Sequence, residues 1–559
     1  MNFLESKKLT LILEIVITIS AAILINIIAS FYFLRIDLTE ENRFSISPAT
    51  KKMLTTLDDD IFIEAYLDGD LPAAFRRMKS SLEETLNEFA IYSNGKIQYQ
   101  FVNPDQAASA KSRNQFMMSL SRKGIQPTDI FLTEDGKRIQ KRIVPGVVIS
   151  YGNIERGVQL FKGNKTASPE QRINQSIEGI EYELAKAIQD IIAIDLPTIG
   201  IIRGHNEIDS ADFVSLYRTL EESYIIKTVN ITQVEEIPNF DAILLAKPTT
   251  RFSSKDKYKL DQYLMNGGTG LFLIDKVAVN MDSANVGTFS FPYDLDLDDL
   301  LFTYGVRINN DLIQDFVSGT YPIVVGNEGN QPNIQLLQWP YYPVVNEYSK
   351  HVTVRNLDAT ITRFASSIDT VKALGITKTL LFSSSLYSRK LMSPTFIDIN
   401  LMQQELDPSK FATSNIPMAY LLEGQFTSFF KNKFLPDGIS NENFKATGYS
   451  KLIIISDGDF VRNDFDPKTG QPLPLGYNPF TNQTFANQDL IINILSYLTK
   501  GNGLITARSK QVIIRPLDKV KLKSGKFKWQ IINLVIPILL VILFGVLNFW
   551  IRKRKYSRY

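Results

Sequence analysis

The chain contains no cysteine among its 559 residues, and this absence excludes several classes of chemistry at once. Disulfides, thiolate nucleophiles, cysteine-ligated zinc and iron–sulfur clusters all require that side chain. Histidine is almost as scarce, because only His205 and His351 occur, so a metal site built from several histidines is excluded as well. We therefore expect no cofactor and no metal, and a fold stabilised by its packed cores alone.

A large charge of one sign is also missing. The chain has 61 basic and 59 acidic residues and a formal net charge of +2, so no global field recruits nucleic acid. The glycine-rich stretch at residues 266–270 has no Gly-Lys-Ser/Thr, and it follows an expected helix and precedes an expected strand, the reverse of a phosphate-binding loop. We expect no nucleic-acid partner and no ATPase site.

Two long apolar runs without a formal charge are present, one near each end of the chain. Residues 15–34 and 531–550 each hold 20 such residues. At 1.5 Å rise per residue, 20 helical residues span a hydrocarbon core of about 30 Å. We predict a transmembrane helix in each run. A cleaved signal peptide is the alternative for the first, but its apolar core is about 7 to 15 residues and ends in small residues, whereas this run ends in Phe-Tyr-Phe-Leu.

The charges beside these runs predict the orientation. The tail at residues 551–559 carries five basic residues, which resist translocation, so both termini should be cytoplasmic and residues 35–530 extracytoplasmic, which places the protein in the inner (cytoplasmic) membrane with a periplasmic domain. Five lysines at residues 519–528 disagree, although segments that follow a long translocated domain obey the charge rule poorly.

The first extracytoplasmic part, residues 35–195, has the pattern of an α/β domain. Strands are expected at residues 61–67 and 96–102, and a hairpin pairs residues 146–151 with 157–161 across Gly152-Asn153. Helices are expected from residue 71, at 106–123, and in a last segment with apolar residues every three to four positions (Ile177, Ile180, Leu184, Ile188 and Ile191). This β-α-β-α-β-β-α order is that of a thioredoxin-like fold, without the Cys-x-x-Cys of redox members.

The second part, residues 196–500, alternates short apolar strands with helices, which predicts a doubly wound parallel sheet. Expected strands are residues 198–202, 225–229, 242–245, 271–274 and 451–456, and expected helices are 213–222, one beginning at Ser253 or Ser254, and 488–498. A mixed α/β insertion is expected at about residues 278–449, with a turn-rich segment at 340–343. Residues 501–530 form a juxtamembrane segment before the terminal helix and basic tail, 531–559.

The second part also looks like a class I amidotransferase fold, in which a cysteine nucleophile sits on a sharp turn after a strand. Since no cysteine exists, we expect a degenerate, non-catalytic version with no catalytic residue. A cryptic hydrolase would need Ser456, which follows the last strand, to meet His205 as its base. Nothing in the sequence places these two residues side by side.

Doubly wound sheets bind ligands at loops that follow the carboxyl ends of their strands. Two such loops hold the candidate ligand cleft, whose residues are His205, Asn206, Glu207, Asp457 and Asp459. The alternative is that their glycines supply turns and their carboxylates cap helices. Two carboxylates are too few for a cation site, and the Asp294–Asp299 stretch (DLDLDD) lacks the glycine and distal glutamate of a calcium loop, so a solvated strand or helix start is expected there.

Several stretches in a shared order resemble the gliding-motility ABC-transporter auxiliary proteins known as GldG. They are residues 37–54 (DLTEENRFSISPATKKML), 66–79, 174–188, 204–209 (GHNEID), 246–268, 298–309 and 456–463 (SDGDFVRN). The resemblance covers nearly the whole chain, and it implies an inner-membrane accessory, substrate-binding-like subunit that works with a separate ABC ATPase and permease. A free-standing extracytoplasmic solute receptor is the alternative function, and the sequence names no small-molecule or polymer ligand for either.

Overall fold

The structure, a computed structural model, describes residues 13–24, 45–106, 110–134, 137–161, 169–192, 196–281, 287–328, 331–355, 357–399, 406–440, 442–499 and 531–556. The chain divides into two compact units, Met1–Lys510 and Gln511–Tyr559. The described elements are a mixture of helices and strands, which confirms the α/β class. The predicted domain limits at residues 195 and 500, and the segment 501–530, lie outside the described residues and stay predictions.

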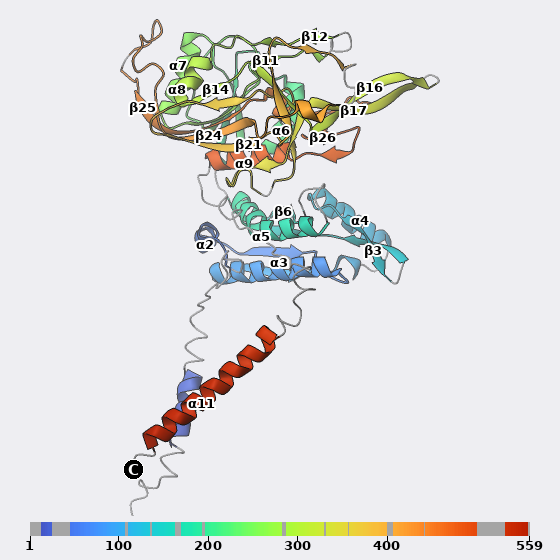
Figure 1. Cartoon of the computed structure of the whole chain (residues 1–559), viewed down its shortest axis with the longest axis vertical. Helices are drawn as coiled ribbons and strands as arrows, with labels where there is room; N and C mark the ends of the chain where they lie inside the picture. The colour runs from blue at the N-terminus through green and yellow to red at the C-terminus, as the bar shows by residue number, and fades with distance from the viewer. Residues whose placement is uncertain are drawn as a thin grey trace, which may run out of the picture. The chain divides into compact units, whose positions relative to one another are not determined.

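A four-stranded sheet in the order β2-β1-β5-β6 organises the first part of the larger unit. Its parallel pair is β1 (Ile61–Ala65) with β2 (Ile97–Phe101), and β5 (Gly146–Tyr151) pairs antiparallel with both β1 and β6 (Ile154–Gln159). The helices are α2 (Pro48–Thr55), α3 (Ala73–Tyr92), α4 (Ala110–Arg122) and α5 (Pro169–Ile192) (Figure 1).

The helices cover both faces of this sheet because its side chains alternate. Apolar residues of α2, α3 and α5 share one core with Ile63 and Ile149, whereas Leu120 of α4 packs with Val148 on the other face. In α3 five apolar residues recur every three to four positions, and all five are buried (Phe75, Met78, Leu82, Leu86 and Phe89). Ser47 caps α2, because its hydroxyl accepts from the backbone N–H of Thr50.

Two features of this region differ from prediction. The hairpin of β3 (Thr128–Glu134) and β4 (Lys137–Ile143) was not predicted, because β4 is mostly charged and lacks a strong apolar alternation. Strand β6 begins at residue 154 rather than 157, which makes the predicted start wrong. Tyr151 pairs with Ile154 directly across the two-residue turn, where Gly152 has a φ of 56°.

An eight-stranded sheet in the order β18-β21-β24-β25-β10-β9-β7-β8 organises the second part. Five of its strands are parallel, and all five were predicted: β7 (Thr198–Arg203), β8 (Ile225–Asn230), β9 (Ala242–Ala246), β10 (Thr269–Leu273) and β25 (Thr447–Ile455). Strands β7, β9, β10 and β25 are largely buried, as expected for strands covered on both faces, whereas β8 lies at the edge of the sheet and has no fully buried residue.

Helices lie on both faces of this sheet (Figure 1), as predicted. In β9 the side chains of Leu244 and Ile243 point into different cores. The first core contains α6 (Ser210–Glu221) and α9 (Asn487–Thr499), and the second contains α7 (Ser254–Met265) and α8 (Asp298–Tyr304). The predicted cap of α7 is confirmed, because the Ser253 hydroxyl accepts from the backbone N–H of Asp256.

The prediction of an all-parallel sheet was wrong at one edge. Strands β18 (Glu347–Tyr348), β21 (Ile376–Ser383) and β24 (Pro417–Thr427) come from the predicted insertion and join the sheet antiparallel, with β24 beside β25. The insertion is therefore partly built into the central sheet. Strands β18, β21 and β24 were not predicted to join the sheet, because they run antiparallel to their neighbours and hydrophobic periodicity does not reveal the direction of a strand.

The rest of the insertion is mostly β-structure. Strands β16 (Ser318–Glu328) and β17 (Gln331–Val345) form a two-stranded arm that projects from the body in Figure 1. The predicted turn at residues 340–343 lies inside β17, so that prediction was wrong; prolines are tolerated there because the pairing with β16 is irregular. The short strands are β11 (Val277–Ala278), β12 (Thr288–Phe289), β13 (Phe291–Pro292), β14 (Val306–Ile308), β15 (Asp311–Asp315), β19 (Thr360–Ile361), β20 (Ile368–Thr370), β22 (Ser388–Met392), β23 (Phe396–Ile397), β26 (Tyr477–Asn478) and β27 (Gln483–Thr484).

An apolar helix is described near each end of the chain. Residues Ile531–Lys555, which contain most of α11 (Ile536–Tyr556), are long and apolar enough to cross a membrane, and their apolar part is not buried within the protein. Residues Leu13–Leu24 form a shorter apolar helix. Positions 25–34 of the first predicted span lie outside the described residues. Length and composition alone thus support the C-terminal prediction more strongly than the N-terminal one.

Candidate functional site

The carboxyl ends of four parallel strands of the central sheet bring ionisable residues to one edge. His205 follows β7, Lys247 follows β9, Asp275 follows β10, and Asp457 follows β25. Since the strands run in one direction, these residues share the edge at which doubly wound sheets place ligands. The predicted cleft residues lie here, together with two residues that were not predicted, Lys247 and Asp275.

The side chain of His205 is buried and 4% exposed. Its ring stacks on Phe252 with centroids 3.6 Å apart, and its Nε2 lies 3.5 Å from Asp256 Oδ2. Within the described residues Nε2 makes no hydrogen bond. Burial lowers the pKa of His205 although the Asp256 and Glu207 carboxylates oppose that shift, so the neutral ring is favoured at pH 7.

Glu207 and Asn206 are engaged inside their own loop. The Glu207 carboxylate accepts the backbone N–H groups of Gly204 and His205 at 2.9 and 3.0 Å. Asn206 has a φ of 53°, a conformation that asparagine tolerates, and its amide donates to Thr249 Oγ1 at 2.7 Å. These contacts hold the loop in shape.

The order of the central strands changes direction between β7 and β9, which is where a doubly wound sheet opens a crevice. In this protein hydrogen bonds join the loops on the two sides of that point. The backbone N–H groups of Thr249 and Thr250 donate to the His205 carbonyl at 2.9 and 3.1 Å, and Ile208 N–H donates to the Ala246 carbonyl at 3.1 Å. The loop after β7 and the loop after β9 are therefore hydrogen-bonded to each other at this point.

Asp457 and Asp459 belong to a buried charge cluster with Lys247 and Asp275. Lys247 Nζ lies 2.5 Å from Asp459 Oδ2 and 3.3 Å from Asp275 Oδ2. Asp457 accepts the backbone N–H groups of Arg363 at 2.7 Å and Asp459 at 2.9 Å. Asp275 accepts the backbone N–H of Gly458. The four side chains thus connect three neighbouring strands to a residue of the insertion.

Burial and charge set the proton occupancy of this cluster. Burial raises the pKa of Asp457 well above its ordinary value, and the neighbouring Asp275 and Asp459 raise it further. Burial also raises the pKa of Asp275 to about 6, against the pull of Lys247. For Asp459 and Lys247 burial opposes ionisation, but opposite charges nearby outweigh it. Asp275 and Asp459 raise the pKa of Lys247, and Lys247, with Arg462 and Arg363, lowers the pKa of Asp459. Lys247 and Asp459 therefore form the ionised pair, and burial favours the protonated form of Asp457.

Ser456 has different neighbours from His205. The Ser456 side chain is buried, and its hydroxyl donates to the Ser366 and Met418 carbonyls. The contacts of the His205 ring are with Phe252 and Asp256. The pairing that a serine hydrolase requires is not among the contacts of either residue in the described chain.

The acidic stretch Asp294–Asp299 leads into helix α8, and a helix start was one of the two structures expected there. Asp298 and Asp299 lie in the first turn of α8, where carboxylates are favoured by the helix dipole. Asp296 pairs with Arg251 and Lys257 at 3.1 and 3.0 Å. Across the described ranges, no group of three or more acidic or histidine side chains is placed to hold a metal ion.

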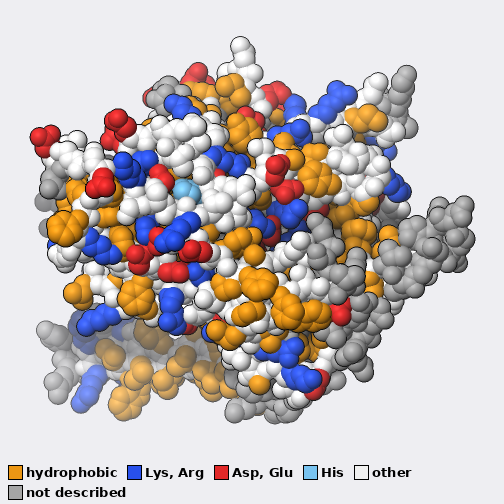
Figure 2. Space-filling model, turned by 90° about the horizontal axis from the view of Figure 1, so that it is seen from above, with side chains coloured by type: hydrophobic (Ala, Val, Ile, Leu, Met, Phe, Trp, Pro, Cys, Tyr) orange, Lys and Arg blue, Asp and Glu red, His pale blue; other side chains and the backbone are white. Residues whose placement is uncertain are grey.

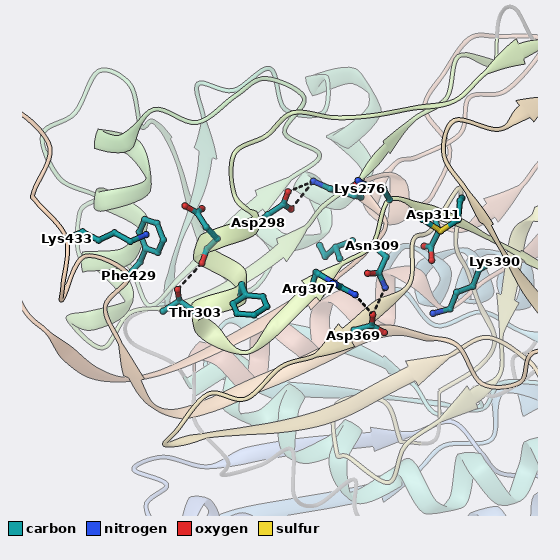
Figure 3. Close-up of a pocket in the computed structure, with 15 residues that line it drawn as sticks. Lys276, Asp298, Thr303, Arg307, Asn309, Asp311, Asp369, Lys390, Phe429 and Lys433 are labelled. Carbon is teal, nitrogen blue, oxygen red and sulfur yellow. Dashed lines mark hydrogen bonds and ion pairs between the residues drawn. The ribbon is translucent and has the colours of Figure 1, made fainter.

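A groove of about 830 Å³ lies beside this edge (Figure 3). It is bordered by α8, β14, β20 and β22, and Lys276, the residue after Asp275, reaches into it. Its charged lining comprises Lys276, Arg307, Lys390, Lys433, Asp298, Asp299, Asp311 and Asp369. This groove was not predicted from the sequence, because its lining residues are spread over more than 150 positions, from Lys276 to Lys433. Both signs of charge are also interspersed on the face seen in Figure 2.

Two family models match the chain. Residues 196–494 match the model described as an ABC-type uncharacterized transport system, and residues 40–150 match a domain of unknown function (DUF7088). A Borreliella burgdorferi protein described as uncharacterized is 23% identical over 573 residues, which cover 99% of this chain and 99% of that protein.

Solved structures resemble the chain only weakly. The mmIFT52 N-terminal domain has 14% identity and a TM-score of 0.31, with 55% of this chain and 98% of that chain covered. A ThuA-like protein of Parabacteroides merdae has 10% identity and a TM-score of 0.27, with 55% and 92% covered. Likenesses of this size carry no argument about the fold.

Proposed function

The chain belongs to the family described as an ABC-type uncharacterized transport system, and from this we propose that it is a non-enzymatic, substrate-binding-like accessory subunit of an ABC transporter complex. The observation that carries the proposal is the match over residues 196–494, which contains the central sheet and its charged edge. The resemblance of the sequence to GldG proteins supports a role of this complex in gliding motility and associated secretion.

We infer that the chain is anchored in the inner membrane by one helix at each end. Support comes from the exposed apolar helix Ile531–Lys555 and from the basic residues that end it. Such residues favour the cytoplasm, so both termini would be cytoplasmic and the large domain periplasmic. The chain has no phosphate-binding loop, and the ATPase and permease would be separate partner subunits.

The finer fold assignments also belong to this proposal. A thioredoxin-like fold for residues 35–195 is supported by the order β2-β1-β5-β6 with one parallel pair, and by α3 and α5 on one face with α4 on the other. A degenerate amidotransferase-like fold for residues 196–500 is supported by the five parallel strands and the loops after them. In both cases the missing cysteine favours a docking role over catalysis.

A pulldown of the tagged full-length chain from native membranes in mild detergent tests the proposal. We expect mass spectrometry to identify an ABC ATPase and a permease in fixed ratio. A matched control replaces residues 536–550 with leucines, which keeps an apolar anchor but changes the surface for helix packing. Recovery of the chain alone, under conditions that preserve other membrane complexes, would contradict the proposal.

Cysteine labelling tests the orientation separately. Because the chain has no cysteine of its own, a single introduced cysteine is the one residue in it that a maleimide labels. Ser440→Cys lies on an exposed part of the large domain, and Ser557→Cys lies in the basic tail. We expect a membrane-impermeant maleimide to label Ser440→Cys but not Ser557→Cys in cells with a permeabilised outer membrane. Labelling of the tail residue in intact inner membranes would reverse the orientation.

A free-standing solute receptor is the second candidate function. The groove of about 830 Å³ beside the charged edge favours it, because small-molecule sites have volumes of about 300 to 1,000 Å³. The same purified chain distinguishes the two functions, since a receptor binds its solute without the ATPase and permease.

A further inference from the structure

We propose that the groove bordered by α8, β14, β20 and β22 binds an elongated small molecule with an anionic group at each end and an apolar middle, as in a linear dicarboxylate. The proposal concerns the purified chain, so it can fail while the accessory-subunit function stands, and the reverse. Its basis is the balance of charged groups in the lining.

The carboxylates of the lining are already engaged by the protein. Asp298 holds the Lys276 ammonium with both oxygens, at 2.7 and 2.8 Å (Figure 3). Asp369 accepts from Arg307 at 3.0 Å and from the Asn309 amide at 2.9 Å. The Asp311 carboxylate accepts from the backbone N–H and the hydroxyl of Ser367. The Asp299 carboxylate accepts from the backbone N–H of Leu300, and Lys257 Nζ lies 3.6 Å away.

Two of the four cations have no such partner. Lys390 on β22 and Lys433 are exposed, and among the described residues neither has a carboxylate within 4.0 Å. The Asp369 carboxylate, which already holds Arg307, attracts Lys390 only from farther away. Lys433 is nevertheless held in place, because its Nζ lies 3.1 Å from the centroid of the Phe429 ring. The lining has four cations and four carboxylates, but Lys390 and Lys433 donate to none of these carboxylates, so the groove suits a ligand that supplies anionic oxygens to them.

Lys390 and Lys433 lie at opposite ends of the site. Figure 3 shows Lys433 beside Phe429 at one end and Lys390 at the other, with the Lys276–Asp298 and Arg307–Asp369 pairs between them. A single compact anion would reach only one lysine. An elongated molecule with two anionic groups would reach both.

Apolar side chains are exposed in the same lining. Phe302 of α8 is 51% exposed and Met392 of β22 is 66% exposed. Large apolar groups in water are unfavourable, and contact with an apolar ligand would remove part of that surface. The middle of the ligand should therefore be a hydrocarbon chain or ring.

The groove also sits where the central sheet favours ligands. Asp275 and Lys276 follow β10 at its carboxyl end, and the first faces the buried charge cluster while the second lines the groove. Occupation of the groove would thus act next to the cluster that joins the strands to the insertion.

The test uses the full chain in nanodiscs of phosphatidylcholine and isothermal titration with linear dicarboxylates from succinate to sebacate. We expect one length to bind about two- to fivefold more tightly than the monocarboxylate of equal length, which is the worth of one exposed ion pair. Lys390→Gln and Lys433→Gln should each abolish this advantage, and Phe302→Ser should weaken every ligand. Lys431→Gln, an exposed lysine outside the lining, is the matched control and should bind as the unchanged chain does.

Four results would overturn the proposal: equal binding of dicarboxylates and monocarboxylates, tighter binding of a linear diamine, an equal loss in Lys431→Gln, and binding of an acidic peptide with no binding of any dicarboxylate. Far-ultraviolet circular dichroism of each variant shows that the fold is retained. Because all four substituted side chains are exposed, we expect each variant to fold.

Discussion

Replacing Lys247 with methionine tests whether the buried cluster is held together by charge. The substitution keeps the length of the side chain but removes the cation that lies 2.5 Å from Asp459 and 3.3 Å from Asp275. Both carboxylates are buried, so neither gains water in exchange. Breaking a buried ion pair by removal of one partner costs about 3 to 5 kcal/mol, and we expect a loss of about 4 kcal/mol at pH 8.

The loss should shrink at lower pH. The pKa of Asp275 is about 6 in the folded protein against an ordinary value of 3.8, so the folded state binds the extra proton and stability falls as pH rises from about 4 to 6. Ionising this one group in the folded protein costs about 3 kcal/mol. Without Lys247 the pKa of Asp275 should rise further, and the pKa of Asp459, which Lys247 lowers, should rise as well. At pH 5 protonation would then remove much of the penalty, leaving a loss of about 1 to 2 kcal/mol.

Urea unfolding of the full chain, followed by the fluorescence of the buried Trp339, measures these values. The other two tryptophans, Trp529 and Trp550, are replaced with phenylalanine in every sample. Lys255→Met is the matched control, because that lysine is exposed and its replacement should change the unfolding free energy by less than about 0.5 kcal/mol.

A second substitution separates charge from packing. In Lys247→Met with Asp459→Asn the uncompensated carboxylate is gone, so the double variant should be more stable at pH 8 than Lys247→Met alone. A loss that is equal at pH 5 and pH 8, or a double variant less stable than the single one, would refute the electrostatic account of the cluster.

Two further predictions concern the central core. Asp261→Ala should cost about 3 kcal/mol in urea unfolding and Asp261→Asn less, because the buried carboxylate accepts from Ser428, Tyr304 and a backbone N–H; equal losses in the two variants would contradict this. Gly448→Ala should cost about 2 kcal/mol or more, because its Cβ would lie 2.0 Å from the Met265 carbonyl oxygen; a thermal midpoint equal to that of the unchanged chain would contradict it.

The elements that were predicted best from the sequence are those that pack against elements close to them along the chain. The strands β7 to β10 and their helices were found because apolar strands alternate with capped helices such as α7. The antiparallel strands β21 and β24 were missed, since their partners depend on contacts that local periodicity does not encode. In β17 the prolines outweighed the alternation around them, and a turn was predicted inside a strand.

The candidate site was predicted in part. His205, Glu207, Asp457 and Asp459 were chosen because they follow strands, and they do lie at the predicted edge. The same rule would have found Lys247 and Asp275, which directly follow two other strands of the sheet. The sequence did not predict the hydrogen bonds between the loops, or that Lys390 and Lys433 line one groove. Both features depend on contacts between distant segments, which leave no local pattern.

The position of β25 has a consequence for the order of folding. It pairs with β10, which precedes it by about 180 residues, and with β24 on its other side. Until the ribosome has synthesised residues 447–455, the hydrogen-bonding edge of β10 has no native partner, and such edges are prone to pair with other chains. Contacts of long sequence separation also slow folding. A chain truncated before residue 447 should therefore aggregate, and a chaperone that covers the β10 edge would be needed longest during synthesis of the insertion.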